Sequence, residues 1–435
     1  MSSSASVRTS PWRRVLAWLR RREWLFRPFA LLASSIALLW LCYGLFLATA
    51  DDDFGRELVS AVTGAVITLA IAGLIALFAL RHRLTALREK QTVRRFAEES
   101  WHTRSISVGE MTIPQMSTVV SCTQGVPWTK RASCSFESVP ERRPRHRLIE
   151  AAREEWLRED MARAKEGGLL FVDLPTADLL DARLELRAEG NRRVPHYQLK
   201  VGETTYFEFA STALKLDRTV IDNDSQERSL RDALGVDPTS ILDVGGLPIP
   251  ASIGSGTVAV TSDNRIILGV RLRTFVAGLA DTTGTKLPVH VVAEGLTPTD
   301  VDANGHFSPL EGAKRALREE LHVGPRSDHI ARVIELIETG FSFDQQRWQP
   351  YFSFLARLDR TWSEIQTGIH AATDAWESEM LLSLPFDIEH AGLRLLLQGR
   401  HPDLQLASNH AAVALWFALL YQHGFEQMRN ELTAS

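Results

Sequence analysis

Two long apolar runs dominate the hydrophobic pattern at the start of the chain. Residues 28–50 and 58–80 contain no charged side chain, and only residues 51–57 separate them. Each run exceeds the roughly 20 residues that an α-helix needs to cross the hydrocarbon core of a bilayer. The pattern therefore predicts a transmembrane helical hairpin over residues 28–80, closed by a tight acidic turn.

Basic residues flank both apolar runs. The flanking residues are Arg13, Arg14, Arg20, Arg21, Arg22 and Arg27 before the first run, and Arg81, Arg83, Arg88, Lys90, Arg94 and Arg95 after the second. Because cytoplasmic flanks carry the excess of Lys and Arg, we expect an integral membrane protein with two spans and both termini in the cytoplasm. Residues 1–27 are expected to form a basic interfacial segment, which makes the lipid bilayer a predicted partner. A cleavable signal peptide is the alternative, since residues 48–50 form an A-x-A site, but the run is too long and a second run follows.

Small side chains recur every four residues in the second run. They are Ser60, Gly64, Thr68, Ala72 and Ala76. Such a stripe lets two helix backbones approach closely. It predicts either packing of the hairpin on itself or a homo-oligomer formed through the second helix.

The rest of the chain alternates between polar and apolar positions on a shorter scale. Residues 81–140 are expected to form a linker, and residues 141–250 a mixed α+β region. In that region a charged helix stops at Gly167, and alternating residues suggest a hairpin closed at Gly202 and Glu203. No catalytic pattern stands out in residues 141–250.

From residue 251 to 435 the pattern becomes more informative. Strands separated by a turn at Asp263 and Asn264 lead to a loop and then to a helix from Pro309 to about His322. Ser308 and Glu311 have capping-box spacing, and proline is favoured in the first turn of a helix.

The predicted helix has three rows of side chains. An apolar row of Leu310, Ala313, Leu317 and Leu321 should face a core. A polar face holds Arg315, which is expected to pair with Glu311 and Glu319 at i,i+4 spacing. A border row contains Gly312, Ala316 and Glu320. A carboxylate on that border is half-buried and needs a partner, so Glu320 is the leading candidate for chemistry.

The stretch RALREELHV, with the Gly-containing loop before it, resembles the Nudix box, which ends R-E-U-x-E-E-x-G-U where U is aliphatic. The matching residues are Arg315, Leu317, Glu319, Glu320 and Val323. The departures are Ala316 in place of a glutamate, His322 in place of a glycine, and Val301 and Phe307 at the upstream glycine and glutamate positions. The box is therefore degenerate.

The resemblance implies a Nudix-like α/β/α sandwich over residues 251–435. The predicted fold class is thus α/β, with the two-span hairpin and the mixed α+β region preceding this sandwich. In the family such a domain binds substrates in which a diphosphate is linked to a nucleoside or another group. It holds Mg²⁺ or Mn²⁺ on glutamates of the box helix and often on a more distant acid, and the ion neutralises the diphosphate.

Carried over to this chain, the resemblance assigns three sets of residues. Glu319, Glu320 and Arg315 would be catalytic; Gly305, His306, Gly312 and Ala316 would contact the ligand; and Glu320, Glu319, Glu311, Glu377 and Glu379 would hold the metal. Glu338 is a second candidate for the distant acid. Because Ala316 removes half of a carboxylate pair, the metal site is expected to be weakened.

Composition and charge narrow the range of functions. The chain is 45% hydrophobic and 23% charged, as in folded proteins, and its formal net charge is -4. Binding to nucleic-acid phosphates needs a clear basic excess, so no nucleic-acid partner is expected. Three cysteines form no disulfide framework, which indicates a reducing compartment.

Three functions remain open on the sequence. The first is a sensor or effector that binds a nucleoside-diphosphate-linked ligand with weak or absent hydrolysis. The second is a divalent-metal-dependent hydrolase that cleaves a diphosphate linkage. The third is a non-catalytic interaction domain in which the glutamates of the box are only salt-bridge partners.

Overall fold

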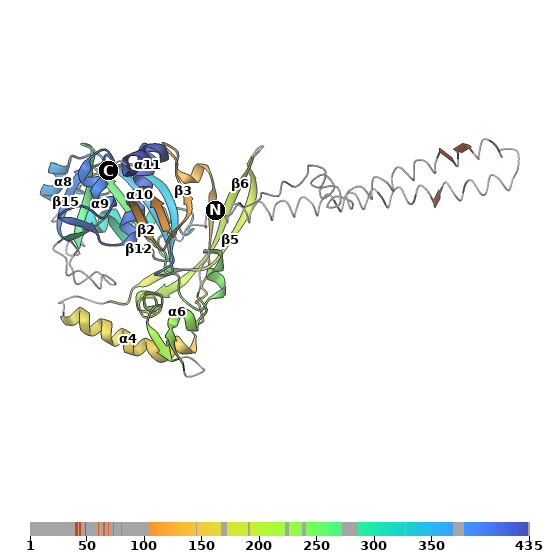
Figure 1. Ribbon diagram of the computed structural model, residues 1–435, viewed down its shortest axis with the longest axis horizontal. Helices are drawn as coiled ribbons and strands as arrows, with labels where there is room; N and C mark the ends of the chain where they lie inside the picture. Colours follow the sequence, from red (N-terminus) through yellow and green to blue (C-terminus); the bar gives the residue numbers. More distant parts are fainter. Residues whose placement is uncertain are drawn as a thin grey trace, which may run out of the picture. The chain divides into compact units, whose positions relative to one another are not determined.

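The computed structural model in Figure 1 divides the chain into two compact units, Met1–Thr92 and Val93–Ser435. The structure describes isolated positions between 40 and 80, and residues 105–144, 146–166, 172–189, 192–221, 226–236, 241–271, 286–326, 328–368 and 378–433. The basic segment predicted at residues 1–27 lies outside the described residues.

The helices that the structure describes contradict the predicted fold class and membrane location. No helix among the described residues is both long and apolar enough to cross a membrane, and most of residues 28–80 lie outside them. Helix α4 (Arg147–Glu166) has the length but is rich in charge. Helix α10 (Asn409–His423) is apolar but has 15 residues, fewer than the roughly 20 that a span needs. The part of the chain that the structure describes is mixed α/β with several sheets, and the two-span prediction with two cytoplasmic termini is wrong for it.

The small-residue stripe is described only in part. Ser60, Gly64 and Thr68 are helical, and the Thr68 hydroxyl donates to the Gly64 carbonyl at 2.8 Å. Ala72 and Ala76 lie outside the described residues. Oligomerisation through this stripe stays a prediction.

The second unit is built on a mixed main sheet, which contains nine strands within the described residues. Its path is β16 (Leu404–Leu406), β11 (Leu287–His290), β10 (Arg265–Arg271), β9 (Gly254–Val260), β14 (Gln349–Leu358), β13 (Val333–Asp344) and β3 (Met116–Ser121). β12 (Val292–Gly295) pairs with β9, and β15 (Ser378–Pro385) pairs with β10. The pairs β9–β14 and β11–β16 are parallel, and the other pairs are antiparallel.

Helices α7 (Pro309–Leu321) and α10 cover opposite faces of this sheet. Successive side chains of a strand point to opposite faces. In β9, Ala259 belongs to the core cluster that contains Ala316 and Leu317 of α7. Its neighbours Val258 and Val260 belong to the cluster that contains most of α10. The sheet is therefore buried on both faces.

A smaller three-stranded sheet precedes the main sheet in sequence. It consists of β4 (Ser133–Ser138), β6 (Arg192–Thr205) and β5 (Pro175–Glu189), in that order across the sheet. β6 runs straight through Gly202, so the hairpin predicted there is wrong; the hairpin is formed by β5 and β6. A side chain at Gly202 would collide with the Glu141 carbonyl and with Leu180. The glycine thus permits a close approach of two segments rather than a turn.

Short elements complete the second unit. They are β1 (Ser105–Val108), β2 (Met111–Pro114), η1 (Trp128–Lys130), α5 (Tyr206–Ala210), η2 (Ala213–Lys215), β7 (Thr219–Ile221), β8 (Glu227–Ser229), α6 (Leu230–Ala233), η3 (Ile241–Gly246), α8 (Trp362–Gly368), α9 (Ala391–Leu397) and α11 (Phe425–Thr433). α4 lies beside β7, and in Figure 1 α10 lies against the strands of the main sheet.

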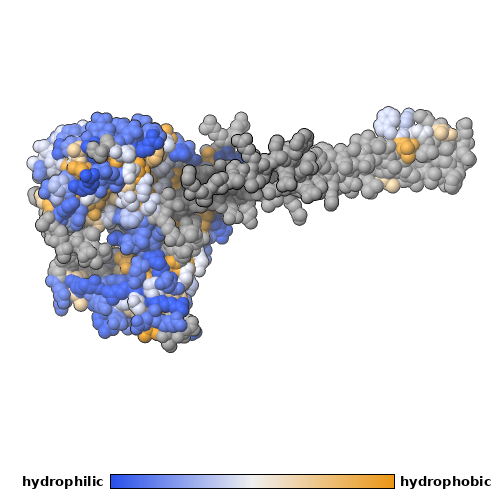
Figure 2. All heavy atoms as spheres, viewed as in Figure 1, coloured by the Kyte–Doolittle hydropathy of each residue, from blue (hydrophilic) through white to orange (hydrophobic). Residues whose placement is uncertain are grey.

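The two sheets share a hydrophobic core. The Phe136 ring of β4 lies 5.3 Å from the Phe307 ring and 5.9 Å from the Phe352 ring of β14. β3, from the predicted linker, pairs with β13 in the main sheet. On the face drawn in Figure 2, the described surface of this unit is mostly hydrophilic with scattered apolar side chains. The predicted segments 81–140, 141–250 and 251–435 therefore each contribute to one folded unit.

Candidate functional site

The helix of the degenerate box forms where its local signals predict it. Ser308 caps α7, and its hydroxyl accepts a hydrogen bond from the Glu311 amide, while Pro309 occupies the first turn. The Glu311 carboxylate does not complete the capping box but pairs with Lys314 at 2.7 Å. The predicted helix from Pro309 to about His322 is confirmed, and it ends at Leu321.

His322 takes the backbone conformation that a glycine would favour. Its φ is 53°, in the left-handed region. The His322 amide bonds to the Arg318 carbonyl, four residues back, which is the hydrogen bond of an αL helix end, and the Val323 amide bonds to the Leu317 carbonyl. The position of the family's glycine therefore keeps the expected backbone, although its side chain is imidazole.

Arg315 is the centre of an acidic cluster. Its Nε lies 2.9 Å from Asp300 Oδ1 and its Nη1 lies 2.9 Å from Glu319 Oε2. Its Nη2 donates to the Gly295 carbonyl and to Asp300 Oδ2, and Glu294 lies 3.6 Å from Nη1. Burial by itself disfavours the charged guanidinium, but the Asp300 hydrogen bond and the surrounding negative charges outweigh it and raise the pKa of Arg315. The guanidinium thus compensates part of the negative charge of the cluster.

The partners of Arg315 differ in part from the prediction. Glu319 is a partner, as i,i+4 spacing predicts, but Glu311 is not, because it pairs with Lys314. Asp300 takes its place from the loop before the helix. The Asp300 carboxylate is buried and also accepts a hydrogen bond from the Thr297 amide at 2.8 Å, which holds it in position.

Gly312 and Ala316 lie inside the protein. A side chain on Gly312 would overlap the Leu296 Cδ2 methyl group and crowd Asp300. Ala316 is 1% exposed and packs in the core beneath α7. The space that was expected to receive a ligand at Gly312 is therefore filled by the loop that carries Leu296 and Asp300.

Glu320 points inward from the border of the helix. It is 9% exposed, and its Oε1 accepts a hydrogen bond of 2.9 Å from the Ala293 amide in β12. The prediction that this carboxylate is shielded and has a partner is confirmed. The contact ties α7 to the strand beneath it.

The upstream positions of the box have become apolar structure. Val301 forms an isolated bridge with Phe307. Phe307 stands where the family has a glutamate, and it is buried against Phe136. Ala316 and Phe307, the two positions at which the resemblance to the Nudix box predicts glutamates, are therefore both part of the core.

Gly305 and His306 lie in an exposed turn before α7. Gly305 has a φ of 80° with open space around it. The amide of His306 donates to Asp302 Oδ1 at 2.9 Å, and its side chain is 71% exposed. These two residues form a solvent-facing turn.

The acids predicted to hold a metal do not come together in the described structure. Glu377 lies outside the described residues, and Glu379 is in β15 with its side chain not described. Within the described ranges, no group of three or more His, Cys, Asp or Glu side chains could hold a metal ion. Glu319 and Asp300 are bonded to Arg315, so these carboxylates do not fit a divalent ion in this arrangement.

Glu338 lies on the same face of the sheet as α7. Glu338 pairs with Phe354, Phe354 with Thr257, and Thr257 with Val292, so these four residues form one row across the sheet. Val292 lies beneath α7. Burial raises the pKa of Glu338 to about 8. The Thr257 hydroxyl in the same row is buried without a partner among the described residues. Glu338 could be picked out from the sequence because it is an acid within an apolar stretch, whereas no sequence pattern pointed to Thr257.

Arg318 was not expected to contribute to a site. Of the three cations on α7, it is the one without an ion pair in the part of the chain that the structure describes, since Lys314 pairs with Glu311 and Arg315 with Asp300. It packs beside Gly324 with the His329 ring. Arg318 is partly exposed, and such a cation can form charge-assisted hydrogen bonds to an anion.

Comparison with known proteins adds no family assignment. No protein-family model matches the chain, and no curated protein matches it either.

Proposed function

We propose that the second unit is a Nudix-like sensor domain that binds a nucleoside-diphosphate-linked ligand beside α7 without hydrolysing it efficiently. One observation carries this proposal. α7 forms as a regular helix on which Arg315 and Glu320 both have partners, whereas the two positions at which the Nudix box has further carboxylates hold the buried residues Ala316 and Phe307. A helix that retains its shape but has lost these acids supports recognition more than metal-assisted chemistry.

The charges around α7 indicate how a diphosphate would be held. Arg315 already serves Asp300 and Glu319, so its donors are committed. Arg318 retains its capacity to form charge-assisted hydrogen bonds to phosphate oxygens, which are stronger than neutral ones. Arg318, which is partly exposed on α7, would therefore contact the diphosphate.

Calorimetric titration of the full chain tests this proposal. The ligands are ADP-ribose, a dinucleotide and dNTPs, each with and without Mg²⁺, and products are assayed in the same samples. We expect binding of at least one ligand with little turnover, and roughly tenfold weaker binding in Arg318→Gln, the loss of one charged hydrogen bond. Arg326→Gln is the matched control, because Arg326 is exposed and pairs with Asp328.

Two outcomes would replace the proposal. Mg²⁺-dependent turnover that Glu320→Gln abolishes would select the hydrolase; glutamine keeps an oxygen that can accept from the Ala293 amide. No binding of any nucleotide would select the interaction domain.

A further inference from the structure

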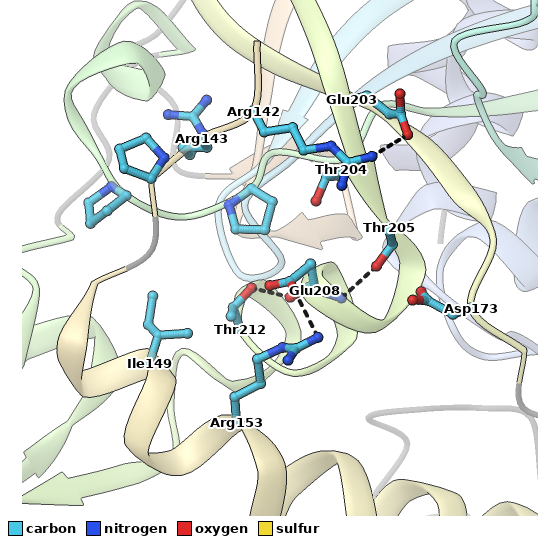
Figure 3. A pocket seen from close by; sticks show the side chains of 13 residues that line it. Arg142, Arg143, Ile149, Arg153, Asp173, Glu203, Thr204, Thr205, Glu208 and Thr212 are labelled. Carbon is cyan, nitrogen blue, oxygen red and sulfur yellow. Dashed lines mark hydrogen bonds and ion pairs between the residues drawn. The ribbon is translucent and has the colours of Figure 1, made fainter. Parts of the chain in front are cut away.

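The cavity between α4, α5 and the end of β6 is balanced in charge (Figure 3). Three arginines and three carboxylates line it. Two of the arginines are paired, Arg142 with Glu203 at 2.7 Å and Arg153 with Glu208 at 2.8 Å. This cavity therefore selects no ligand by charge, whereas backbone groups without a partner lie at an edge of the main sheet.

β15 forms that edge. It pairs with β10 along its length, from Arg265 opposite Pro385 to Val270 opposite Met380. No strand within the described ranges pairs with its other side. The outer side of β15 is thus a row of backbone groups to which another strand can be added.

Alternate residues of β15 direct their backbone groups outward. The Phe386 amide donates to the Asn264 carbonyl at 2.9 Å. Because bonded and non-bonded pairs alternate in an antiparallel ladder, residues 380, 382 and 384 bond to β10, and the backbone groups of Leu381 and Ser383 face away from it. Pro385 occupies the next outward position, where its missing amide hydrogen costs no bond to β10.

The outward groups are accessible to a partner. The amide and carbonyl of Leu381 have no hydrogen-bond partner among the described residues. Arg265 reaches Ser383 from β10, with Nη2 at 3.2 Å from the carbonyl and Nε at 2.8 Å from the hydroxyl. Since a carbonyl oxygen has two lone pairs, a strand amide can bond to it as well.

The side chains of β15 are apolar on both faces of the sheet. Leu381 packs against the core beneath α7, and Leu382 and Leu384 pack against the core beneath α10. Met380 is 48% exposed, and no side chain from Met380 to Pro385 is charged. Native proteins usually protect a free edge with charges. A strand that is added here must therefore be uncharged and apolar on both faces.

We propose that β15 pairs antiparallel with β15 of a second copy of this chain. β15 is itself an uncharged strand with two apolar faces, and a two-fold axis perpendicular to the sheet joins each face to the same face of the partner. With Leu382 on the axis, the Leu381 amide donates to the carbonyl of the partner subunit's Ser383, and the Ser383 amide donates to the carbonyl of the partner subunit's Leu381. The symmetric pair completes four hydrogen bonds between the two main sheets.

Charge and size limit the strength of this dimer. Arg265 is partly exposed and lies on the same face in both copies, so dimerisation brings two guanidinium groups toward each other, and salt screens their repulsion. A single pair of strands is also a small interface. We therefore expect dissociation in the micromolar range and a dimer that added salt strengthens.

Sedimentation analysis of the full chain, from low to high micromolar protein, tests this inference. Ser383→Pro removes the outward amide hydrogen and leaves the bonds to β10 intact, so we expect its dimer to be at least tenfold weaker. Ser383→Ala is the matched control, because it keeps the amide, and its dimer should remain. Circular dichroism checks that both variants fold.

A disulfide localises the contact. On the axis, Leu382 faces its own counterpart in a non-hydrogen-bonded pair, whose Cα atoms lie about 4.5 Å apart, within the range that a disulfide spans. Leu382→Cys should therefore form a disulfide-linked dimer under mild oxidation. Met380→Cys is the control, because its position faces the partner subunit's Leu384 and not its own counterpart.

Three results would overturn the proposal. They are a monomer at every concentration, a dimer unchanged in Ser383→Pro, and equal disulfide yields in Leu382→Cys and Met380→Cys. The second would place the contact elsewhere in the chain. Should Ser383→Pro fail to fold, the two cysteine variants still decide.

Discussion

The Nε2 atom of His410 lies 3.0 Å from Oδ2 of Asp344, and both side chains are buried. The His410 ring also stacks on Tyr351, with ring centroids 4.3 Å apart. His410 belongs to the first turn of α10, and Asp344 ends β13, so this contact fixes the start of α10 on the main sheet.

The contact makes stability depend on pH. Burial lowers the pKa of His410, more than Asp344 raises it. Burial alone would raise the pKa of Asp344, but the contact with His410 and the Arg347 charge and amide lower it below its usual range. Because the folded state resists protonation of both groups, their contribution to stability is lost as the pH falls, for His410 from its unfolded pKa of roughly 6.5 downward.

Replacing His410 isolates its share of this effect. We expect His410→Gln to be less stable than the parent at pH 7.5, and the difference in free energy of unfolding to shrink by pH 5.5. Urea denaturation at both pH values measures it. A difference that stays constant or grows on acidification would contradict the assignment.

For Glu338 we expect the opposite dependence of stability on pH. Its folded pKa of about 8 exceeds the usual value, so the folded state holds a proton that the unfolded state releases, and stability falls as the pH rises toward 8. Glu338→Gln removes this ionisation. We expect the variant to gain about 1–3 kcal/mol over the parent at pH 8.5, and less at pH 5.5. Denaturant unfolding at both pH values checks the sign, and a variant less stable than the parent at pH 8.5 would refute it.

Gly312 is required by the close approach of α7 to its preceding loop. Alanine is normally better than glycine in a helix by about 1 kcal/mol, but here its Cβ overlaps Leu296 and crowds Asp300. We expect Gly312→Ala to lose about 1–3 kcal/mol of stability in spite of that gain. Lys314→Ala, on the exposed side of the same helix, should change stability by less than about 0.5 kcal/mol. A stabilised Gly312→Ala protein would show that the loop is free to move away.

Arg315 neutralises a buried carboxylate. Arg315→Met leaves Asp300, which is 5% exposed, without its cation. We expect a loss of about 2–4 kcal/mol in the free energy of unfolding. This is below the full cost of breaking a buried pair, because Glu319, the other carboxylate bonded to Arg315, is partly exposed. Asp300→Asn in the Arg315→Met background should recover part of the loss. Glu311→Gln, which removes only a partly exposed pair with Lys314, should be nearly neutral. Equal stability losses in Arg315→Met and Glu311→Gln would contradict the central role of Arg315.

Local patterns predicted the box helix well. Ser308, Pro309 and the apolar row place α7 correctly, since caps and periodicity depend on residues within a few positions of one another. The same geometry placed Glu320 on the border of the core, where it is buried and bonded. The apolar runs at residues 28–80 predicted membrane spans that the described helices do not contain.

Contacts between distant segments were decided only by the tertiary structure. Asp300 replaces Glu311 at Arg315 because a loop folds onto Gly312, and Gly202 lies within β6, where it leaves room for the Glu141 carbonyl. The Asp344–His410 contact likewise joins segments far apart in sequence. By itself the sequence determined which residues form α7 and which of its side chains face inward, because neighbouring residues suffice for a helix. Which partners those side chains meet depended on how loops and strands pack, and no local pattern carries that information.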